Sequence, residues 1–291
     1  MRRYISLFLL LLGLQTSYAQ KRQTYEEYIH KYKNLAIEEM MRYRIPASIT
    51  LAQGLLESGA GNSELARKSN NHFGIKCGGS WEGPSVRHTD DAPNECFRAY
   101  RHPKESYEDH SKFLVTRPRY AFLFQLSPTD YRGWARGLKK AGYATDPGYA
   151  EKLIGIIENY RLYQYDTKRR RGADEHIEYH QPYLANDLLY ILARPGDTFK
   201  SIAKEFDMSR RKLARYNELP KNHEFEGGEV VYLEMKRDRA TPEHIIYKVK
   251  DGDSMHSIAQ TYGIKLKRLY KMNEMTPEDD MPPVGSFMRL R

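Results

Sequence analysis

Apolar residues recur at helical spacing through much of the first half of the chain. Tyr28 and Met40 fall on one face of a segment that we expect to be helical over 25–43. Pro46 ends this helix, because the residue before a proline avoids the helical conformation, and it starts a second one. The second helix is apolar along most of its length, and glycines stop it just after Glu57.

The pattern changes between Cys77 and Tyr100. Short alternating runs, broken by glycine and proline, predict a β-hairpin in this segment. Helical spacing returns after Pro103 and continues to the end of the first half. We therefore expect one mainly helical domain with a small β-lobe over 23–165.

The last third of the chain contains an internal repeat. Each copy has a β-like run, a helix opened by Gly-Asp-Thr or Gly-Asp-Ser, a second helix and a closing strand, and Asn217 aligns with Asn273. An ungapped register over so many positions indicates two copies of one β-α-α-β module. We place the copies at 189–235 and 245–291.

Composition and charge narrow the class of protein. Hydrophobic residues make up 40% of the 291 positions, which is typical of a globular protein and excludes a polytopic membrane protein. The formal net charge of +9 suggests an anionic partner, which leaves nucleic acid, a membrane surface or a cell wall. Four consecutive cations within 166–188 disfavour compact structure, so we expect a linker there.

The N-terminal residues predict export. Arg2 and Arg3 precede an apolar run, and small residues at Ser17 and Ala19 follow it, as in a secretory signal peptide over 1–19. The apolar run is too short to span a bilayer, which takes about 20 residues, so we expect no transmembrane segment in the mature protein. Export argues against nucleic acid as the partner and favours the periplasm, the cell wall or the extracellular space.

The two cysteines are consistent with export, and their spacing does not indicate a metal site. The chain has two cysteines, Cys77 and Cys96, and an oxidising compartment would allow them to form a disulfide. Two buried free thiols are the alternative. No Cys/His group with metal-ligand spacing stands out, so we expect neither a metal nor a cofactor.

Glu57 is the candidate for acid chemistry. It ends an apolar helix, directly after Leu55 and Leu56. Desolvation and the negative end of the helix dipole both favour the protonated carboxyl. A carboxylic acid that stays neutral near pH 7 can donate a proton to a glycosidic oxygen. Most isolated glutamates at helix ends are only surface residues. The surrounding motifs are therefore needed to distinguish a catalytic acid from a surface glutamate.

Four segments in order resemble the glucosaminidase domain of glycoside hydrolase family 73. They are 57–63, 71–76, 96–100 and 141–149, and the similarity extends over about 30–162. The resemblance implies a lysozyme-like fold and cleavage of the β-1,4 bond after N-acetylglucosamine in peptidoglycan.

The resemblance also implies roles for individual residues. Glu57 would be the general acid, and Tyr143 would position the substrate. Further ligand contacts are expected at Asn71, Phe73, Glu95 and Tyr149. The second carboxylate stays open among Asp90, Asp91 and Glu95. A substrate-assisted route through the 2-acetamido group is the alternative.

The repeated module resembles LysM, through the Gly-Asp-Thr and Gly-Asp-Ser turns, the Ile-Ala pairs and the aligned asparagines. This resemblance implies binding to N-acetylglucosamine-containing glycans such as peptidoglycan or chitin. The sugar contacts that it implies lie in the two turns, at Gly196, Asp197 and Thr198, and at Gly252, Asp253 and Ser254.

These observations predict an α+β protein, with a lysozyme-like, mainly helical catalytic domain and two βααβ modules. The predicted function is that of an exported bacterial peptidoglycan hydrolase, an endo-β-N-acetylglucosaminidase tethered to strands of N-acetylglucosamine and N-acetylmuramic acid. The alternatives are a lytic transglycosylase of lysozyme-like fold and a non-catalytic peptidoglycan-binding scaffold.

Overall fold

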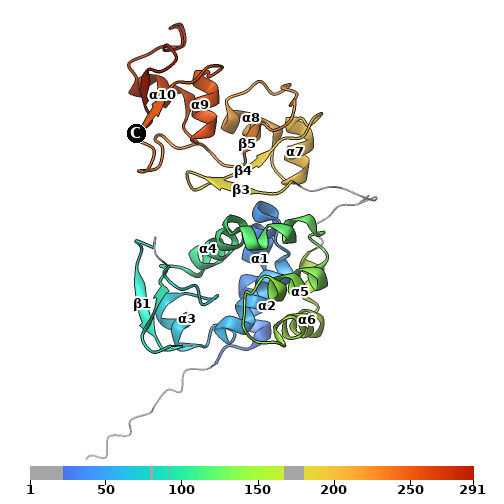
Figure 1. The fold of residues 1–291 in the computed structure, drawn as a ribbon. Helices are drawn as coiled ribbons and strands as arrows, with labels where there is room; N and C mark the ends of the chain where they lie inside the picture. Colours follow the sequence, from blue (N-terminus) through green and yellow to red (C-terminus); the bar gives the residue numbers. More distant parts are fainter. Residues whose placement is uncertain (1–21, 79–80, 91, 167–179) are drawn as a thin grey trace, which may run out of the picture.

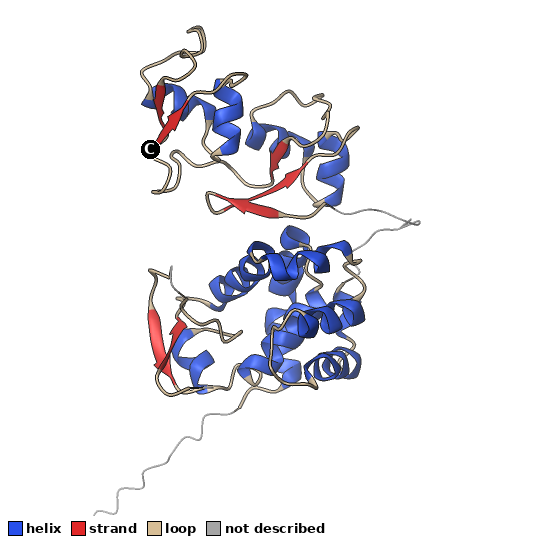
Figure 2. Cartoon of the chain, viewed as in Figure 1, coloured by secondary structure: helices blue, strands red, loops and turns tan. Residues whose placement is uncertain are grey.

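The computed structural model has a helical part, on one side of which two small modules lie next to each other (Figure 1). It describes residues 22–78, 81–90, 92–166 and 180–291. The signal peptide expected at 1–19 lies outside the described residues. Helices and small antiparallel sheets occur together, which confirms the α+β fold class (Figure 2). None of the helices in the described ranges has both the length and the hydrophobicity that crossing a bilayer requires.

Helix α2 (Ala47–Ser58) forms the centre of the helical part. Nearly all of its side chains are buried, so it needs apolar cover on every side. Most of this cover comes from three helices and one 3-10 helix: α1 (Tyr25–Tyr43), α5 (Tyr131–Lys140), α6 (Tyr149–Asn159) and η2 (Leu162–Tyr165). The last turn of α2 is where this cover ends.

The other elements complete the helical part and its β-lobe. They are α3 (Glu64–Ser69), β1 (Ser85–His88), β2 (Glu95–Arg98), α4 (Pro103–Thr116) and η1 (Pro118–Gln125). Strands β1 and β2 pair antiparallel, with Val86 opposite Phe97, as the alternating sequence predicts. The hairpin stands at one edge of the helical part (Figure 1).

Local sequence signals explain where the helices start and stop. The Thr24 side chain accepts a hydrogen bond from the Glu27 amide, and the Glu27 carboxylate accepts one from Thr24, which closes a capping box before α1. The Asp130 side chain caps α5 by accepting a single hydrogen bond from the Gly133 amide. Gly59 takes a left-handed conformation (φ 55°) and ends α2.

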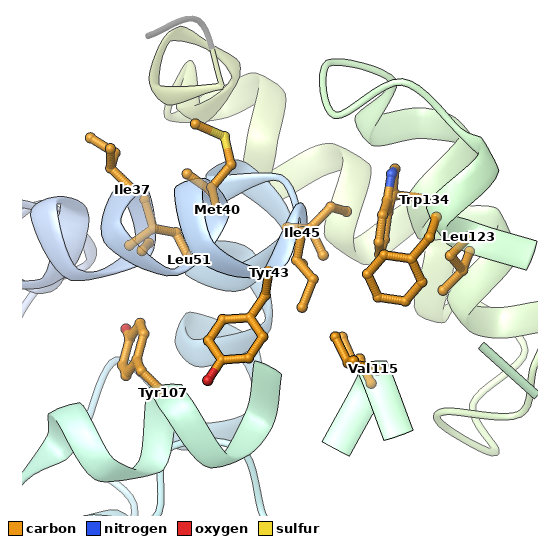
Figure 3. Packing of buried hydrophobic residues seen from close by; sticks show 14 of the residues in the cluster. Ile37, Met40, Tyr43, Ile45, Leu51, Tyr107, Val115, Leu123 and Trp134 are labelled. Atoms are coloured by element: carbon orange, nitrogen blue, oxygen red, sulfur yellow. The ribbon is translucent and has the colours of Figure 1, made fainter. Parts of the chain in front are cut away.

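The core of the helical part is rich in large aromatic side chains. Tyr43, Leu51, Tyr107 and Trp134 come from four helices and are fully buried (Figure 3). Burying each such side chain contributes about 1.5–3 kcal/mol, so these contacts are a major source of the stability of this part.

Both modules show the predicted β-α-α-β order. The first module (180–235) contains β3 (Tyr183–Ala185), β4 (Leu188–Leu192), α7 (Phe199–Glu205), α8 (Arg210–Asn217) and β5 (Val230–Tyr232). The second module (240–291) contains β6 (Ile246–Lys248), α9 (Met255–Thr261), α10 (Leu266–Met272) and β7 (Phe287–Arg289). Strand β3 was not expected, and it extends the sheet of the first module to three strands in the order β3-β4-β5.

The described ends of the expected linker at 166–188 belong to the folded parts. Asp166 is buried and accepts hydrogen bonds of 2.8 and 2.6 Å from the amide and hydroxyl of Ser48, at the start of α2. His180 is buried in the first module, where its Nε2 lies 2.8 Å from Asp197 Oδ2. Charge composition alone did not reveal these contacts, because they form with residues far away in the sequence.

The first module is docked on the helical part. Strand β3 contacts α4, and the buried apolar residues of both parts form one continuous cluster. Arg42 of α1 pairs with Glu234, directly after β5, and its guanidinium also lies 3.6 Å from Glu39 and 3.6 Å from Glu108. Burial raises the pKa of Glu39 to about 7, so this boundary contains a carboxyl that titrates near neutrality.

A buried polar network joins the two modules. Lys236 is only 2% exposed, and its ammonium contacts Glu218 at 2.7 Å and Gln260 at 2.8 Å. Gln260, on α9, also donates to Asn217 of the first module at 2.7 Å. Since a buried cation is costly unless it is paired, these contacts hold the modules in one relative orientation.

A disulfide joins Cys77 and Cys96, which are separated by 19 positions in the sequence. The Cys77 amide also donates to the Cys96 carbonyl at 2.9 Å, so the chain is linked twice at this point. By the chain-entropy estimate, closing a loop of this length contributes about 3 kcal/mol.

Reducing this disulfide should loosen the β-lobe while the helical core stays folded. The β1–β2 hairpin buries few apolar side chains, whereas α2 is enclosed on all sides. Hydrogen exchange with and without dithiothreitol measures this: amides of β1 and β2 should exchange faster after reduction, and those of α2 should not. Equal protection of β1 and β2 in both states would contradict the stabilising role of the disulfide.

Candidate active site

Glu57 lies in the last turn of α2, where the central helix reaches the surface. Leu55 is fully buried, whereas Glu57 is exposed. The left-handed Gly59 then turns the chain away, and the Gly61 amide donates to the Ser58 hydroxyl at 2.7 Å. The sequence around Glu57 thus fixes the turn that presents its carboxylate.

A buried tyrosine holds the Glu57 carboxylate. Tyr149, at the start of α6, is 2% exposed, and its hydroxyl donates to Glu57 Oε1 at 2.8 Å. The Gln53 Nε2 group donates to the same hydroxyl oxygen at 2.9 Å. Because an amide nitrogen can only donate, the tyrosine oxygen accepts from Gln53 and its proton is directed at Glu57.

This chain of hydrogen bonds begins one helix further away. His110 Nε2, on α4, lies 3.1 Å from Gln53 Oε1. Burial lowers the pKa of His110 to about 3, so the imidazole is neutral at physiological pH. A neutral imidazole with its proton on Nε2 donates to Gln53, which in turn orients the Gln53 amide toward Tyr149.

Burial is the main influence on the Glu57 carboxyl, and it raises the pKa of that group. The hydrogen bond from Tyr149 acts in the opposite direction, and the negative charge of Asp90 raises the pKa further. Although Glu57 as a residue is accessible, protein atoms surround its carboxyl closely enough for desolvation to dominate. The arrangement favours a protonated acid that a ligand can reach.

Tyr143 lies against the same group without bonding to Glu57. Its ring stacks on that of Tyr149, with centroids 5.7 Å apart and planes 20° from parallel. Burial and the charge of Glu57 raise the pKa of Tyr143 well above its usual range, so the hydroxyl stays protonated. Phe113 and Tyr120 pack on its other sides, with centroids 6.2 and 6.3 Å away.

The three expected carboxylates of the β-lobe have different surroundings. Asp90 follows β1 and is exposed, and its negative charge raises the pKa of Glu57. Asp91 lies outside the described residues. Glu95, on β2, pairs with Lys76 at 2.7 Å and accepts a hydrogen bond from the Ala92 amide at 3.2 Å. Asp90 therefore lies within electrostatic range of Glu57, whereas Glu95 is engaged within the lobe.

Asn71 and Phe73, which we expected to contact a ligand, are buried instead. The Asn71 amide donates to the carbonyls of Ile75 and Arg98, both at 2.9 Å, and is 1% exposed. The Phe73 ring is 3% exposed and stacks on His110 with centroids 4.0 Å apart. Asn71 supports its loop, and Phe73 supports His110 in the hydrogen-bonded chain.

The carboxylates of the two module turns are used within the modules. Asp197 accepts from the Arg194 amide at 2.7 Å and contacts His180, whereas Asp253 accepts from Tyr247 and from the Lys250 amide, both at 2.7 Å. Thr198 and Ser254 each cap the following helix, and Gly196 and Gly252 adopt left-handed conformations. These six residues shape the turns, so ligand contacts there would fall mainly to the backbone.

Two residues of the site escaped sequence analysis. Gln53 lies one helical turn before Glu57 on the same face of α2, and this spacing is a signal that was available. His110 had no such signal, because only the packing of α4 on α2 brings it to Gln53.

Within the described ranges, no group of three or more His, Cys, Asp or Glu side chains is arranged to hold a metal ion.

Comparisons with known families agree with both resemblances. Residues 33–162 match the glucosaminidase model, described as mannosyl-glycoprotein endo-beta-N-acetylglucosaminidase. Residues 193–223 and 247–290 match the LysM domain model.

Individual relatives cover different parts of the chain. The exo-glucosaminidase LytG of Bacillus subtilis is 38% identical over 138 residues, which are 43% of this chain and 48% of the relative. An autolysin of Enterococcus faecalis is 28% identical over 263 residues, 78% of this chain and 35% of the relative. The chain therefore spans less than half of the length of these relatives. The solved catalytic domain of the autolysin Auto from Listeria monocytogenes is 31% identical, with a TM-score of 0.43, over 51% of this chain and 91% of that domain.

Removing the buried link between Gln53 and Tyr149 should destabilise the fold. Gln53→Leu leaves the His110 Nε2 group without its acceptor and the Tyr149 hydroxyl oxygen without its donor, although the Tyr149 hydroxyl can still donate to Glu57. This loss should cost about 1–3 kcal/mol of unfolding free energy. Chemical denaturation of Gln53→Leu, Tyr149→Phe and the double variant measures the loss and the coupling between the two sites. Additive losses would show that the two side chains do not interact in solution.

Proposed function

Because residues 33–162 form a domain of the glucosaminidase family, we propose that this chain is an exported peptidoglycan hydrolase that cleaves the β-1,4 bond after N-acetylglucosamine. One observation carries the proposal: Glu57 combines an accessible position, a raised pKa and a fixed hydrogen bond from Tyr149. These are the properties of a general acid for glycosidic bonds.

In this proposal, the protonated Glu57 donates its proton to the glycosidic oxygen. The bond from the anomeric carbon to that oxygen breaks, and the leaving sugar departs as an alcohol. Glu57 is then a carboxylate, and the Tyr149 hydroxyl donates to it at once because Gln53 already holds it in place. Burial thus favours the acid before the transfer, and the hydrogen bond stabilises the carboxylate afterwards.

We propose Asp90 as the second carboxylate. It would accept a proton from the water that attacks the anomeric carbon. Its exposure and its electrostatic effect on Glu57 support this role, whereas the pairing of Glu95 with Lys76 argues against Glu95. In a substrate-assisted route, the oxygen of the 2-acetamido group would attack instead, and Asp90 would not be essential.

The two modules would tether the enzyme to the wall. Their match to the LysM model and the long alignment with an autolysin support binding to peptidoglycan glycan strands. The disulfide between Cys77 and Cys96 supports an oxidising location, as does the signal peptide expected at 1–19. We propose the periplasm or the cell wall as the site of action.

Replacing Glu57 by Gln should lower the rate of peptidoglycan hydrolysis by about 10²-fold or more, because the amide has no transferable proton. The unfolding free energy at neutral pH should stay equal or rise, since the folded protein opposes ionisation of this carboxyl. Release of soluble fragments from purified peptidoglycan measures the rate. Activity within about three-fold of wild type would exclude Glu57 as the acid.

Product analysis by mass spectrometry tests the reaction type. Reducing-end N-acetylglucosamine is expected, whereas 1,6-anhydro-muramic ends would identify a lytic transglycosylase, and a wild type without any products would point to a binding scaffold. In the same assay, Asp90→Asn should lose about 10²-fold if Asp90 is the base. An almost unchanged Asp90→Asn rate would favour the substrate-assisted route.

Asp253 and Asp251 offer a matched pair for testing the wall tether. Both are acids of the same turn, but only Asp253 holds it, through Tyr247 and the Lys250 amide. In a Glu57→Gln background, Asp253→Ala should weaken binding to intact peptidoglycan by about 10-fold or more, because one of two linked sites is lost. Asp251→Ala should bind as the parent does. Equal pull-down of both variants would contradict a tether through this turn.

A further inference from the structure

Arg117 lies beside the proposed substrate-positioning tyrosine. It occupies the joint between α4 and η1, where Pro118 holds the preceding backbone extended (φ −97°, ψ 119°). Its guanidinium lies over the ring of Phe113, with its central carbon 3.5 Å from the ring centroid. The Phe113 ring meets Tyr143 edge to face at 6.2 Å, so Arg117 is connected to the site through a single ring.

The charge of Arg117 is not compensated. Among the residues that the structure describes, no side chain forms an ion pair or a hydrogen bond with this half-buried guanidinium. Asp109 is nearby, but it already accepts two hydrogen bonds of 2.9 Å from Arg98 and one of 2.5 Å from Tyr100.

Two further cations make this position unfavourable for a positive charge. Partial burial, followed by the charge of Arg119 and then that of Arg98, lowers the pKa of Arg117, and Tyr120 and Asp109 offset this only in part. A guanidinium remains charged under such conditions, so the local field is positive and lacks a counter-charge. A bound anion would remove this imbalance and form strong, charge-assisted hydrogen bonds.

We propose that Arg117 forms a subsite for a carboxylate of the substrate, on the Tyr143 side of Glu57. This inference rests on the proposed function. Peptidoglycan carries carboxylates on the lactyl groups of its muramic sugars or on the attached peptides, whereas chitin-like N-acetylglucosamine chains carry none. The subsite would therefore make the enzyme prefer wall glycans to neutral chains of the same linkage.

The test compares dissociation constants of full-length protein in a Glu57→Gln background, so that the ligands stay intact. The ligands are peptide-free muramic-acid oligosaccharides, peptide-bearing ones and neutral N-acetylglucosamine oligomers of equal length. Arg117→Gln removes the charge and Arg117→Lys keeps it. Arg132→Gln is the matched control, because it removes a guanidinium of the same domain that is already paired with Glu158 on α6.

Arg117→Gln should reduce the preference for carboxylate-bearing over neutral ligands by about ten-fold, the usual weight of one charge-assisted hydrogen bond. Arg117→Lys should keep most of this preference, and Arg132→Gln should keep all of it. A loss confined to peptide-free ligands identifies the lactyl carboxylate, and one confined to peptide-bearing ligands identifies a peptide carboxylate.

An unchanged preference in Arg117→Gln, equal weakening of charged and neutral ligands, or no measurable binding of any ligand would overturn the inference. Hydrolysis by the wild type is measured separately. A wild type that binds these ligands but cleaves none contradicts the proposed function, whereas the comparison of dissociation constants still decides the role of Arg117.

Discussion

The hydrogen bond from Tyr149 to Glu57 connects the buried core of the helical part to its accessible face. This hydrogen bond forms because α6 packs on α2 and α4 brings His110 to Gln53. Gln53 then donates to the Tyr149 oxygen, so the Tyr149 proton is directed at Glu57. The same packing desolvates the Glu57 carboxyl. One arrangement of three helices thus sets both the position and the protonation of the proposed acid.

Most of the local structure follows from short-range signals. Thr24, Asp130 and Gly59 stand where the helices begin or end, and the aligned Thr198 and Ser254 cap equivalent helices of the two modules. Capping and turn formation involve neighbours in the chain, so sequence reveals them. Glu57 was identifiable for the same reason, because its helix and the glycines after it are local features.

The rest depends on contacts between distant residues, which no local pattern encodes. The motif around Asn71 and Phe73 suggested ligand contacts, but tertiary packing buries both side chains under the loop. His110 reaches Gln53, and Phe113 brings Arg117 near Tyr143, only when α4 folds against its neighbours. The run of cations predicted a linker that included His180. His180 instead belongs to the first module, where it contacts Asp197 and Glu205.

The central claim is that burial holds the Glu57 carboxyl in its protonated form beyond the ordinary range of a glutamate. Titration of the Glu57 side-chain carbon by NMR, in the full-length protein without ligand, measures this directly. The account predicts a pKa above the reference value of 4.5, because desolvation outweighs the hydrogen bond from Tyr149. A pKa at or below this reference would contradict it, since burial would then not favour the protonated form of Glu57.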